Sequence, residues 1–276
     1  MTHETSLDRL QREYRENGGC CLRSVVSPPW IERLRGAFAE SRAAPSSLSK
    51  TWRAEAGPGC FFQDVFVWRR VAELRRFALE SGIARAVATL LGARELRLYS
   101  DHVFMRDVGT EKDTPWHQDE SYCFVTGSQF CSVWLPLDAV SQHECLQLVR
   151  GSHRDSPLYS PVEFASRSAY AGAAAAGAAL PSLDAGPRSS PDILSWDMRL
   201  GDCLVFSART LHGSTAHPAA TGPRRAYVTR WIGDDARYTE QAWTVPALPR
   251  PTGLRRGDPF SGELFPLAYA AGGATG

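Results

Sequence analysis

Residues 96–105 read LRLYSDHVFM, and at this point the spacing of apolar residues along the chain changes. Before this stretch apolar residues recur at helical intervals. After it they alternate with polar residues over short β-rich runs that Gly, Pro and Asp separate. No alternation of strands and helices follows, so we predict a mainly β fold, a barrel or jelly roll with flanking helices. The predicted strands are Leu96–Met105, Phe130–Val140, Leu146–Val149, Cys203–Ser207 and Arg225–Ile232.

The first third of the chain is predicted to be mostly helical. Leu7, Leu10 and Tyr14 recur at helical spacing, and the glycines at 18 and 19 end that pattern. Ser27 followed by two prolines is typical of a helix start. We therefore predict helices at Leu7–Glu16, from Pro28 through Trp30, Leu34 and Phe38, and at about Val71–Leu91, with a strand at Cys20–Val26.

The 276 residues, 43% of them hydrophobic, are enough for one large core, and we expect a single domain over residues 1–276. Its parts would be N-terminal helices over about 1–95 and a jelly-roll core over about 96–235. An insertion rich in Ala, Gly and Ser interrupts this core at about 165–190. Such an insertion is either a lid or a plain surface loop, and both readings stay open.

Composition narrows the classes of partner. The 31 basic and 30 acidic residues give a net charge of +1, which provides no field for nucleic acid or an anionic membrane, so a small-molecule partner is expected. The seven cysteines show no C-x-x-C spacing and are expected to be reduced and buried. A polar N-terminus and the lack of a membrane-length apolar run favour a cytoplasmic protein. The oligomeric state is left open.

Residues 116–120, WHQDE, form the sharpest local motif. On a strand, His117 and Asp119 would point to the same face, because strand side chains alternate with a period of two. Two histidines and one carboxylate form the facial triad that binds non-haem Fe(II) and leaves coordination positions open. An H-x-D triplet is a weak signal alone, since it often arises by chance.

A third ligand is needed, and His212 is the best candidate among the remaining histidines. It follows the largely apolar run Cys203–Leu211 and precedes a glycine and a serine, as a residue at the rim of a strand would. His143 and His153 lie in polar turns, and His3 lies near the terminus. The same triad would also suit a zinc hydrolase or a simple metal-binding module.

Arg224 is a candidate anchor for an anionic co-substrate, because the planar guanidinium binds a carboxylate in bidentate fashion. It lies 12 positions after His212, and a hairpin return would place it beside the histidine strand. Ala226, Val228 and Arg230 lie on the same face of the predicted strand as Arg224. The side chains of Ala226 and Val228 are small and leave room for a ligand. A register slip of one residue would put Arg225 there instead.

These motifs resemble the phytanoyl-CoA dioxygenase family of Fe(II)- and 2-oxoglutarate-dependent oxygenases, and the resemblance covers most of the chain. It implies a double-stranded β-helix in which His117, Asp119 and His212 bind iron and Arg224 binds 2-oxoglutarate. Gln118, Trp134 and Ser214 would line the co-substrate site, and His102 is either a further contact or a core histidine. The matching segments are WHQD (116–119), SVWLPLD (132–138), CLQLVRGSH (145–153), LHGS (211–214) and RRA (224–226).

The resemblance implies an enzyme that uses Fe(II), 2-oxoglutarate and O2, releases succinate and CO2, and oxidises a C–H bond of a small organic substrate. Hydroxylation, epimerisation, desaturation and ring closure remain open, whereas Asp119 disfavours halogenation, since halogenating relatives lack this carboxylate.

The aromatic residues Trp116, Tyr122 and Phe124 either wall the substrate site or pack in the core. Aromatic walls, and a composition typical of GC-rich bacteria, favour a secondary metabolite as substrate, as in antibiotic biosynthesis. An acyl-CoA, an osmolyte such as ectoine, and a non-catalytic metal-binding jelly roll are the alternatives.

Overall fold

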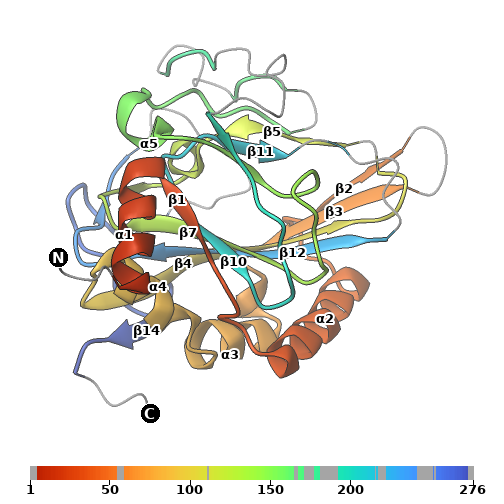
Figure 1. The fold of residues 1–276 in the computed structure, drawn as a ribbon, viewed down its shortest axis with the longest axis horizontal. Coiled ribbons are helices and arrows are strands. Elements are labelled where there is room, and N and C mark those ends of the chain that lie inside the picture. Colours follow the sequence, from red (N-terminus) through yellow and green to blue (C-terminus); the bar gives the residue numbers. More distant parts are fainter. Residues whose placement is uncertain are drawn as a thin grey trace.

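We analysed a computed structural model of the chain. It describes residues 5–54, 59–110, 112–164, 167–170, 177–180, 192–214, 216, 222–240, 251 and 253–272. The fold is mainly β and has two antiparallel sheets, with most of its helices in the N-terminal third (Figure 1). The predicted insertion at 165–190 lies largely outside the described residues.

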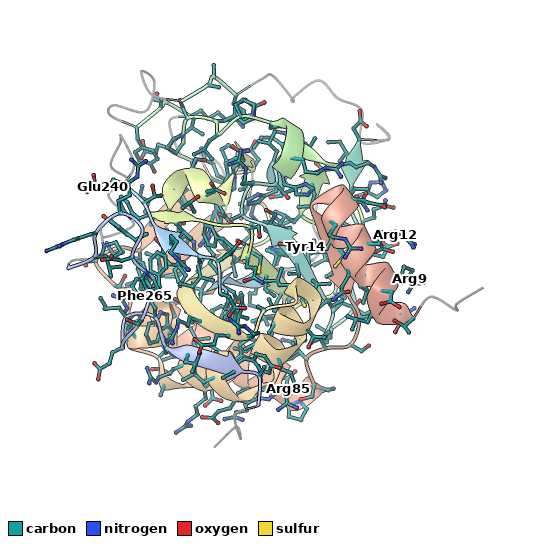
Figure 2. All side chains as sticks on the ribbon, turned by 90° about the vertical axis from the view of Figure 1, so that its left-hand side faces the viewer. Arg9, Arg12, Tyr14, Arg85, Glu240 and Phe265 are labelled. Carbon is teal, nitrogen blue, oxygen red and sulfur yellow. The ribbon has the colours of Figure 1, made fainter. Side chains whose placement is uncertain are left out.

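The helices follow from local signals in the sequence. At the start of α1, Thr5 and Asp8 form a capping box, and Gly18 ends the helix with a φ of 84°, a conformation that glycine adopts without strain. Tyr14 points from α1 toward the sheets, and Arg9 and Arg12 lie on its outer side (Figure 2). The helices are α1 (Ser6–Asn17), α2 (Pro28–Ala43), α3 (Ala72–Glu80), α4 (Ile83–Leu91) and α5 (Ser152–Asp155), with 3₁₀ turns η1 (Val67–Arg69) and η2 (Asp119–Tyr122).

The large sheet separates helices α2, α3 and α4 from the smaller sheet (Figure 1). Helices α2, α3 and α4 cover one of its faces, and β5 and β11 of the smaller sheet lie on the other side. In spatial order its strands are β1 (Gly19–Leu22), β10 (Cys203–Ser207), β7 (Phe130–Pro136), β12 (Arg224–Ile232), β4 (Glu95–Arg106), β3 (Cys60–Val65) and β2 (Lys50–Arg53), and β14 (Leu267–Ala270) also pairs with β4.

The smaller sheet has four short strands, and a two-stranded ribbon lies outside both sheets. The four strands, in spatial order, are β5 (Thr114–His117), β11 (His212–Ser214), β8 (Gln147–Val149) and β9 (Ile193–Leu194). The ribbon pairs β6 (Val125–Thr126) with β13 (Arg237–Tyr238). Side chains from both sheets line one cavity, as expected for a jelly roll.

Alternation along the strands divides the large sheet into two faces. Val133 of β7, Val103 of β4 and Trp231 of β12 are buried against the helices. Their neighbours one position along, such as Trp134 and His102, line the cavity. The helices therefore cover the outer face, and the inner face is available for a site. Among the described residues, no helix is both long and apolar enough to cross a membrane.

The mainly β, jelly-roll prediction is confirmed. Each predicted strand is found, Cys203–Ser207 with its predicted ends and the others with shifted ends. Two predictions about the first third were wrong. The segment Val71–Leu91 forms two helices, because Gly82 adopts a φ of 83° between them. Strands β2 and β3 were missed, so residues 1–95 contain two strands besides the one predicted at Cys20–Val26. This error concerns the site, because both strands contribute to the cavity.

Candidate active site

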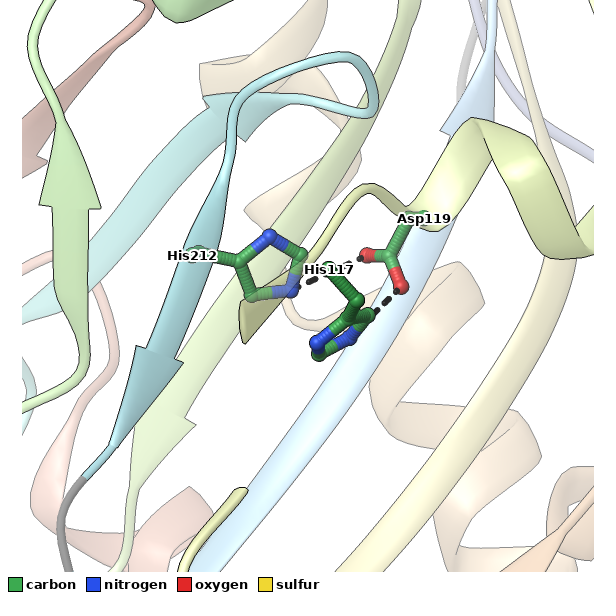
Figure 3. A group of neighbouring side chains, drawn as sticks. All are labelled: His117, Asp119 and His212. Carbon is green, nitrogen blue, oxygen red and sulfur yellow. Dashed lines mark ion pairs between the residues drawn. The ribbon is translucent and has the colours of Figure 1, made fainter. Parts of the chain in front are cut away.

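Three predicted metal ligands lie together at one end of the two facing sheets (Figure 3). His117 ends β5, His212 begins β11, and the two residues are direct partners in the antiparallel ladder. Asp119 does not continue the strand as predicted but opens η2, and this turn brings its carboxylate back to the histidines. Nε2 of His117 is 3.7 Å from Asp119 Oδ1, and Nε2 of His212 is 3.9 Å from Asp119 Oδ2.

Backbone carbonyls orient both imidazole rings. Nδ1 of His117 is 2.8 Å from the Pro115 carbonyl oxygen, and Nδ1 of His212 is 2.9 Å from that of Thr210. A carbonyl only accepts hydrogen bonds, so each Nδ1 carries the proton and each Nε2 offers a lone pair to the centre. Burial and the neighbouring His212 lower the pKa of His117 to about 3, and burial lowers the pKa of His212. Both rings are therefore neutral, which is the form that binds metals.

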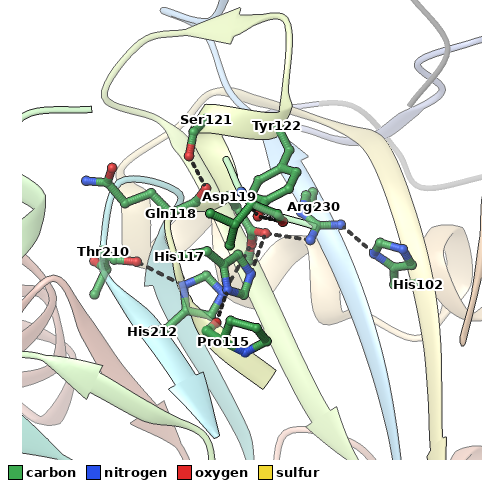
Figure 4. Close-up of polar contacts among 12 residues, drawn as sticks. His102, Pro115, His117, Gln118, Asp119, Ser121, Tyr122, Thr210, His212 and Arg230 are labelled. Carbon is green, nitrogen blue, oxygen red and sulfur yellow. Dashed lines mark hydrogen bonds and ion pairs between the residues drawn. The ribbon is translucent and has the colours of Figure 1, made fainter. Parts of the chain in front are cut away.

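Asp119 is held by two donors from the large sheet. Ser132 donates to its Oδ2 at 2.5 Å. Arg230 Nη2 donates to its Oδ1 at 2.5 Å (Figure 4). Burial alone would raise the pKa of Asp119, but the Arg230 guanidinium beside the carboxylate holds it well below its usual range. The carboxylate is thus ionised although only 1% exposed.

The donor set fits a divalent transition metal. Two neutral imidazole nitrogens and one anionic carboxylate lie within 4.8 Å of one another. This is the composition of the facial triad that binds non-haem Fe(II) and leaves other coordination positions for a chelating acid and dioxygen. The three residues also line the cavity, so such positions would be accessible to small molecules.

The cavity in front of the triad is lined by 22 of the described residues and is partly open to solvent. The large sheet, the smaller sheet and the segment after α5 all contribute to its walls. Its aromatic members, apart from histidine, are Trp52, Phe61, Phe104, Tyr122, Trp134, Phe164, Tyr170 and Phe206. Its charged and polar members, apart from the triad, are Lys50, Gln63, His102, Arg106, Thr114, Ser214, Arg224 and Arg230.

Arg224 lines this cavity, but the strand that carries it lies in a different sheet from the one predicted. Strand β12 pairs with β4 and β7 of the large sheet, not with the histidine strand β11. A hairpin return beside His212 was therefore wrong. Arg224 approaches from the opposite sheet, and its Nη2 donates to Ser214 Oγ of β11 at 3.3 Å. Arg224 and Ser214 come into contact because the two sheets of the jelly roll face each other.

The register of β12 is the one that favours Arg224. Arg224, Ala226, Val228 and Arg230 all line the cavity, as the predicted alternation required. Arg225 points to the other face and forms an ion pair with Asp138 at 2.5 Å. Burial lowers the pKa of Arg224 to about 10, so its guanidinium stays charged at neutral pH.

Four further residues were predicted to lie near the metal: Trp134, Ser214, His102 and Gln118. Trp134, Ser214 and His102 line the cavity. Gln118 is not among the residues that line the cavity, unlike the position predicted for it. Its side-chain amide donates to the carbonyls of Pro157 and Arg209 and accepts from the Tyr159 N–H.

The segment 157–164 depends on two residues that flank Asp119. Gln118 binds its beginning, and the Tyr122 hydroxyl donates to the Val162 carbonyl at 2.7 Å and accepts from the Val162 N–H at 3.1 Å. The same segment carries Phe164, whose ring centroid lies 5.0 Å from that of His117. Gln118 and Tyr122 therefore position a wall of the cavity next to the triad.

Of the aromatic residues predicted to wall the site, Tyr122 does so. Phe124 packs in a separate core against Tyr238, at a centroid distance of 6.2 Å, and Trp116 lies on the other side of β5 near Gly213. Phe124 therefore has the packing role that was the alternative, whereas Trp116 is half-buried. Phe61 and Trp52 of the missed strands take their place in the wall.

Sequence reasoning also missed polar residues at the triad. Arg230 was assigned to the face of Arg224 but given no role, and Ser132 was noted only as part of a motif. Arg106 of β4 is the direct ladder partner of Arg224, and its Nη2 donates to Ser214 Oγ at 3.2 Å and to Thr114 Oγ1 at 2.6 Å. The period-two alternation of β12 could have indicated Arg230. Nothing local in the sequence indicates which residue of β4 faces it.

Comparison with known proteins agrees with this geometry. A sequence model of the phytanoyl-CoA dioxygenase family matches residues 14–226. No curated protein matches the chain by sequence. Among solved structures, the 2-oxoglutarate-dependent epimerase SnoN of nogalamycin biosynthesis superposes with a TM-score of 0.71 and 21% identity, covering 95% of this chain and 98% of SnoN.

Two further structures show the same fold. The carbocyclase SnoK of nogalamycin biosynthesis has a TM-score of 0.70 and 23% identity, with 96% of this chain and 99% of SnoK covered. EctD from S. alaskensis, solved with 2-oxoglutarate and 5-hydroxyectoine, has a TM-score of 0.63 and 18% identity over 91% of this chain and 84% of EctD. Since the family match spans most of the chain, the chain belongs to the phytanoyl-CoA dioxygenase family and is a non-haem iron- and 2-oxoglutarate-dependent oxygenase.

Proposed function

We propose that His117, Asp119 and His212 hold the catalytic Fe(II) and that the enzyme oxidises a C–H bond of a bulky secondary metabolite. The observation that carries this proposal is the convergence of two neutral imidazoles and one ionised carboxylate at the wall of a large cavity. With iron bound, 2-oxoglutarate and O2 supply the oxidising power for hydrogen removal. The residues of the chain position the reactants and exclude water.

Arg224 binds the distal carboxylate of 2-oxoglutarate, with Ser214 beside it. Support comes from the partners of the guanidinium, which are the Glu144 carbonyl and the Ser214 hydroxyl. Within the described part of the chain, no carboxylate pairs with Arg224, so its charge remains available to an anionic ligand. Trp134 and His102 line the same cavity as Arg224 and the triad.

The prime substrate binds between aromatic walls. Phe61 stacks on Phe104 with centroids 6.0 Å apart, and Trp52 continues this wall at 5.2 Å from Phe61. Tyr122 and Phe164 form a second aromatic group, with centroids 6.3 Å apart. Flat apolar surfaces suit a fused-ring or glycosylated compound better than a small osmolyte. Hydroxylation, epimerisation and ring closure all begin with the same hydrogen removal.

Anaerobic titration with Fe(II) and 2-oxoglutarate tests the proposal. A weak visible charge-transfer band should appear only when both are present, and admission of O2 should then yield succinate. A folded protein that shows neither signal would be a non-catalytic module. Hydrolytic turnover without O2 or keto acid would instead identify a zinc hydrolase.

Asp119→Ala should abolish iron retention, with a loss of affinity greater than about 100-fold, because even groups that only orient ligands contribute 10- to 100-fold. Equilibrium dialysis with Fe(II) under argon measures the effect. Asp138→Ala is the matched control, because this carboxylate pairs with Arg225 outside the cavity. Equal iron binding by the two variants would contradict the assignment.

A further inference from the structure

Arg230 connects the proposed metal site to a second cavity residue. Its Nη2 donates to Asp119 Oδ1 at 2.5 Å, and its Nη1 lies 3.1 Å from Nδ1 of His102 (Figure 4). Arg230 is 7% exposed and lies on β12, whereas His102 lies on the adjacent strand β4. One buried guanidinium therefore contacts both the carboxylate of the triad and an imidazole that is not part of it.

This contact determines where the proton of His102 lies. A guanidinium has five N–H donors and no acceptor, and it stays protonated in proteins, so Nδ1 of His102 must accept the hydrogen bond from Arg230. A second positive charge at this distance from Arg230 would be repelled, which keeps the ring neutral. A neutral imidazole whose Nδ1 accepts carries its single proton on Nε2.

The Nε2–H group of His102 has no partner among the described residues, although the atom is buried. Buried donors are almost always satisfied, and an unsatisfied one costs as much as a lost hydrogen bond. His102 lines the same cavity as His117 and Asp119, and its ring packs on Phe104 at a centroid distance of 4.9 Å. The donor thus belongs to a side chain of the cavity that also contains the triad, and a ligand bound there would supply the missing acceptor.

We infer that His102 donates a hydrogen bond through Nε2–H to an oxygen of the 2-oxoglutarate bound at the metal, and that Arg230 is the positioning residue that fixes this tautomer. The inference rests on the proposed function for the identity of the ligand. The tautomer itself rests on the Arg230 contact alone. The same guanidinium holds Asp119, so Arg230 orders a metal ligand and a co-substrate donor together.

Nitrogen-15 NMR of the imidazole rings in the zinc-loaded full-length protein tests the tautomer without turnover. The His102 signals, assigned by their loss in His102→Phe, should show a protonated Nε2 and an unprotonated Nδ1. In Arg230→Met the same ring should become a mixture of tautomers, and in Arg230→Lys, which keeps a donor, Nε2 should stay protonated. A wild-type His102 protonated on Nδ1 would overturn the inference.

Calorimetric titration of the zinc-loaded protein with 2-oxoglutarate tests the donor role. His102→Phe keeps an aromatic ring but removes the donor, and should weaken 2-oxoglutarate binding about 10-fold, with zinc affinity unchanged. His102→Gln restores an N–H donor and should recover most of this loss. Arg230→Met should weaken zinc binding about 10- to 100-fold as well, because it also frees Asp119.

Arg225→Met is the control from the opposite face of β12 and should change neither affinity. Unchanged 2-oxoglutarate binding in His102→Phe, when the wild type binds it, would overturn the donor role and leave the proposed function intact. Failure of the wild type to bind 2-oxoglutarate would overturn both, whereas the proton position measured by NMR would still report the Arg230 contact.

Discussion

The two faces of strand β12 differ in chemistry although they alternate residue by residue. Arg224, Ala226, Val228 and Arg230 face the cavity, where two guanidiniums are separated by small side chains. Tyr227, Thr229 and Trp231 are buried on the side of the helices. The first set is placed to contact a ligand, and the second set packs against the helices. The alternation of side chains along the strand therefore puts ligand-binding residues on one face and stabilising residues on the other.

This separation means that neighbouring substitutions should have unrelated effects. A change on the helix side should alter the free energy of unfolding and leave ligand affinity of the folded protein unchanged. A change on the cavity side should alter ligand affinity and leave the free energy of unfolding largely unchanged. A variant that changes the free energy of unfolding and the ligand affinity to the same extent would contradict this separation of the two faces.

Trp231→Ala should have the largest effect. Trp231 is fully buried among the helices, and its indole N–H donates to Thr229 Oγ1 at 2.8 Å. Removing the ring leaves a cavity and should lower the free energy of unfolding by about 3–5 kcal/mol. Urea denaturation measures the loss, and calorimetry at low temperature should find 2-oxoglutarate affinity within about twofold. A loss of affinity as large as the loss of stability would contradict the separation.

Arg224→Leu should weaken 2-oxoglutarate binding about 30- to 100-fold, because truncating one partner of a buried charge pair costs on the order of 2–3 kcal/mol or more. Metal affinity should be unchanged. Arg225→Leu is the matched variant one residue along, and it loses only the half-exposed ion pair with Asp138, worth up to about 1 kcal/mol of stability. If Arg225→Leu impairs 2-oxoglutarate binding instead, the assignment of the two faces is wrong.

Asp101→Asn should change how stability depends on pH. Asp101 is buried on the helix side, where it accepts from the Tyr227 hydroxyl at 2.8 Å, and burial raises its pKa to about 7. The folded state therefore binds more protons than the unfolded state between pH 4 and 7, and stability falls as the pH rises through that window. The slope from this group is at most about 1.4 kcal/mol per pH unit.

Asn cannot titrate, so the variant should gain stability relative to the wild type from pH 4 to 7, with a constant difference above pH 7. Urea denaturation at pH 5, 6, 7 and 8 measures both curves. Parallel curves over this range would show that Asp101 is ionised throughout in the folded protein.

Gln118→Leu should have the smallest effect and extends the comparison to the metal motif. His117 and Asp119 face the cavity, whereas the Gln118 amide binds the segment 157–164. Loss of these bonds should increase hydrogen exchange in that segment and cost about 1–2 kcal/mol. The affinity for 2-oxoglutarate should remain within about twofold, measured as above. A large drop in affinity would restore the co-substrate role expected from sequence.

The sequence by itself determined the fold class and the candidate metal triad. Apolar alternation after residue 95 indicated short strands, because one face of each strand must be buried, and the H-x-D motif with His212 supplied a complete ligand set. The register of β12 was also predictable, since period-two alternation places Arg224 and Arg230 on one face regardless of its partner strands.

Only the tertiary structure decided which side chains from distant segments line the cavity and contact one another. Strands β2 and β3 are short, and their contribution to the wall depends on pairing with β4, which no local pattern reports. The orientation of Gln118 away from the cavity depends on backbone groups at 157, 159 and 209. The contacts of Arg230 with Asp119 and His102 join three segments distant in sequence. Local periodicity fixes the face on which a side chain lies, whereas its partner is fixed by which sheets pack together.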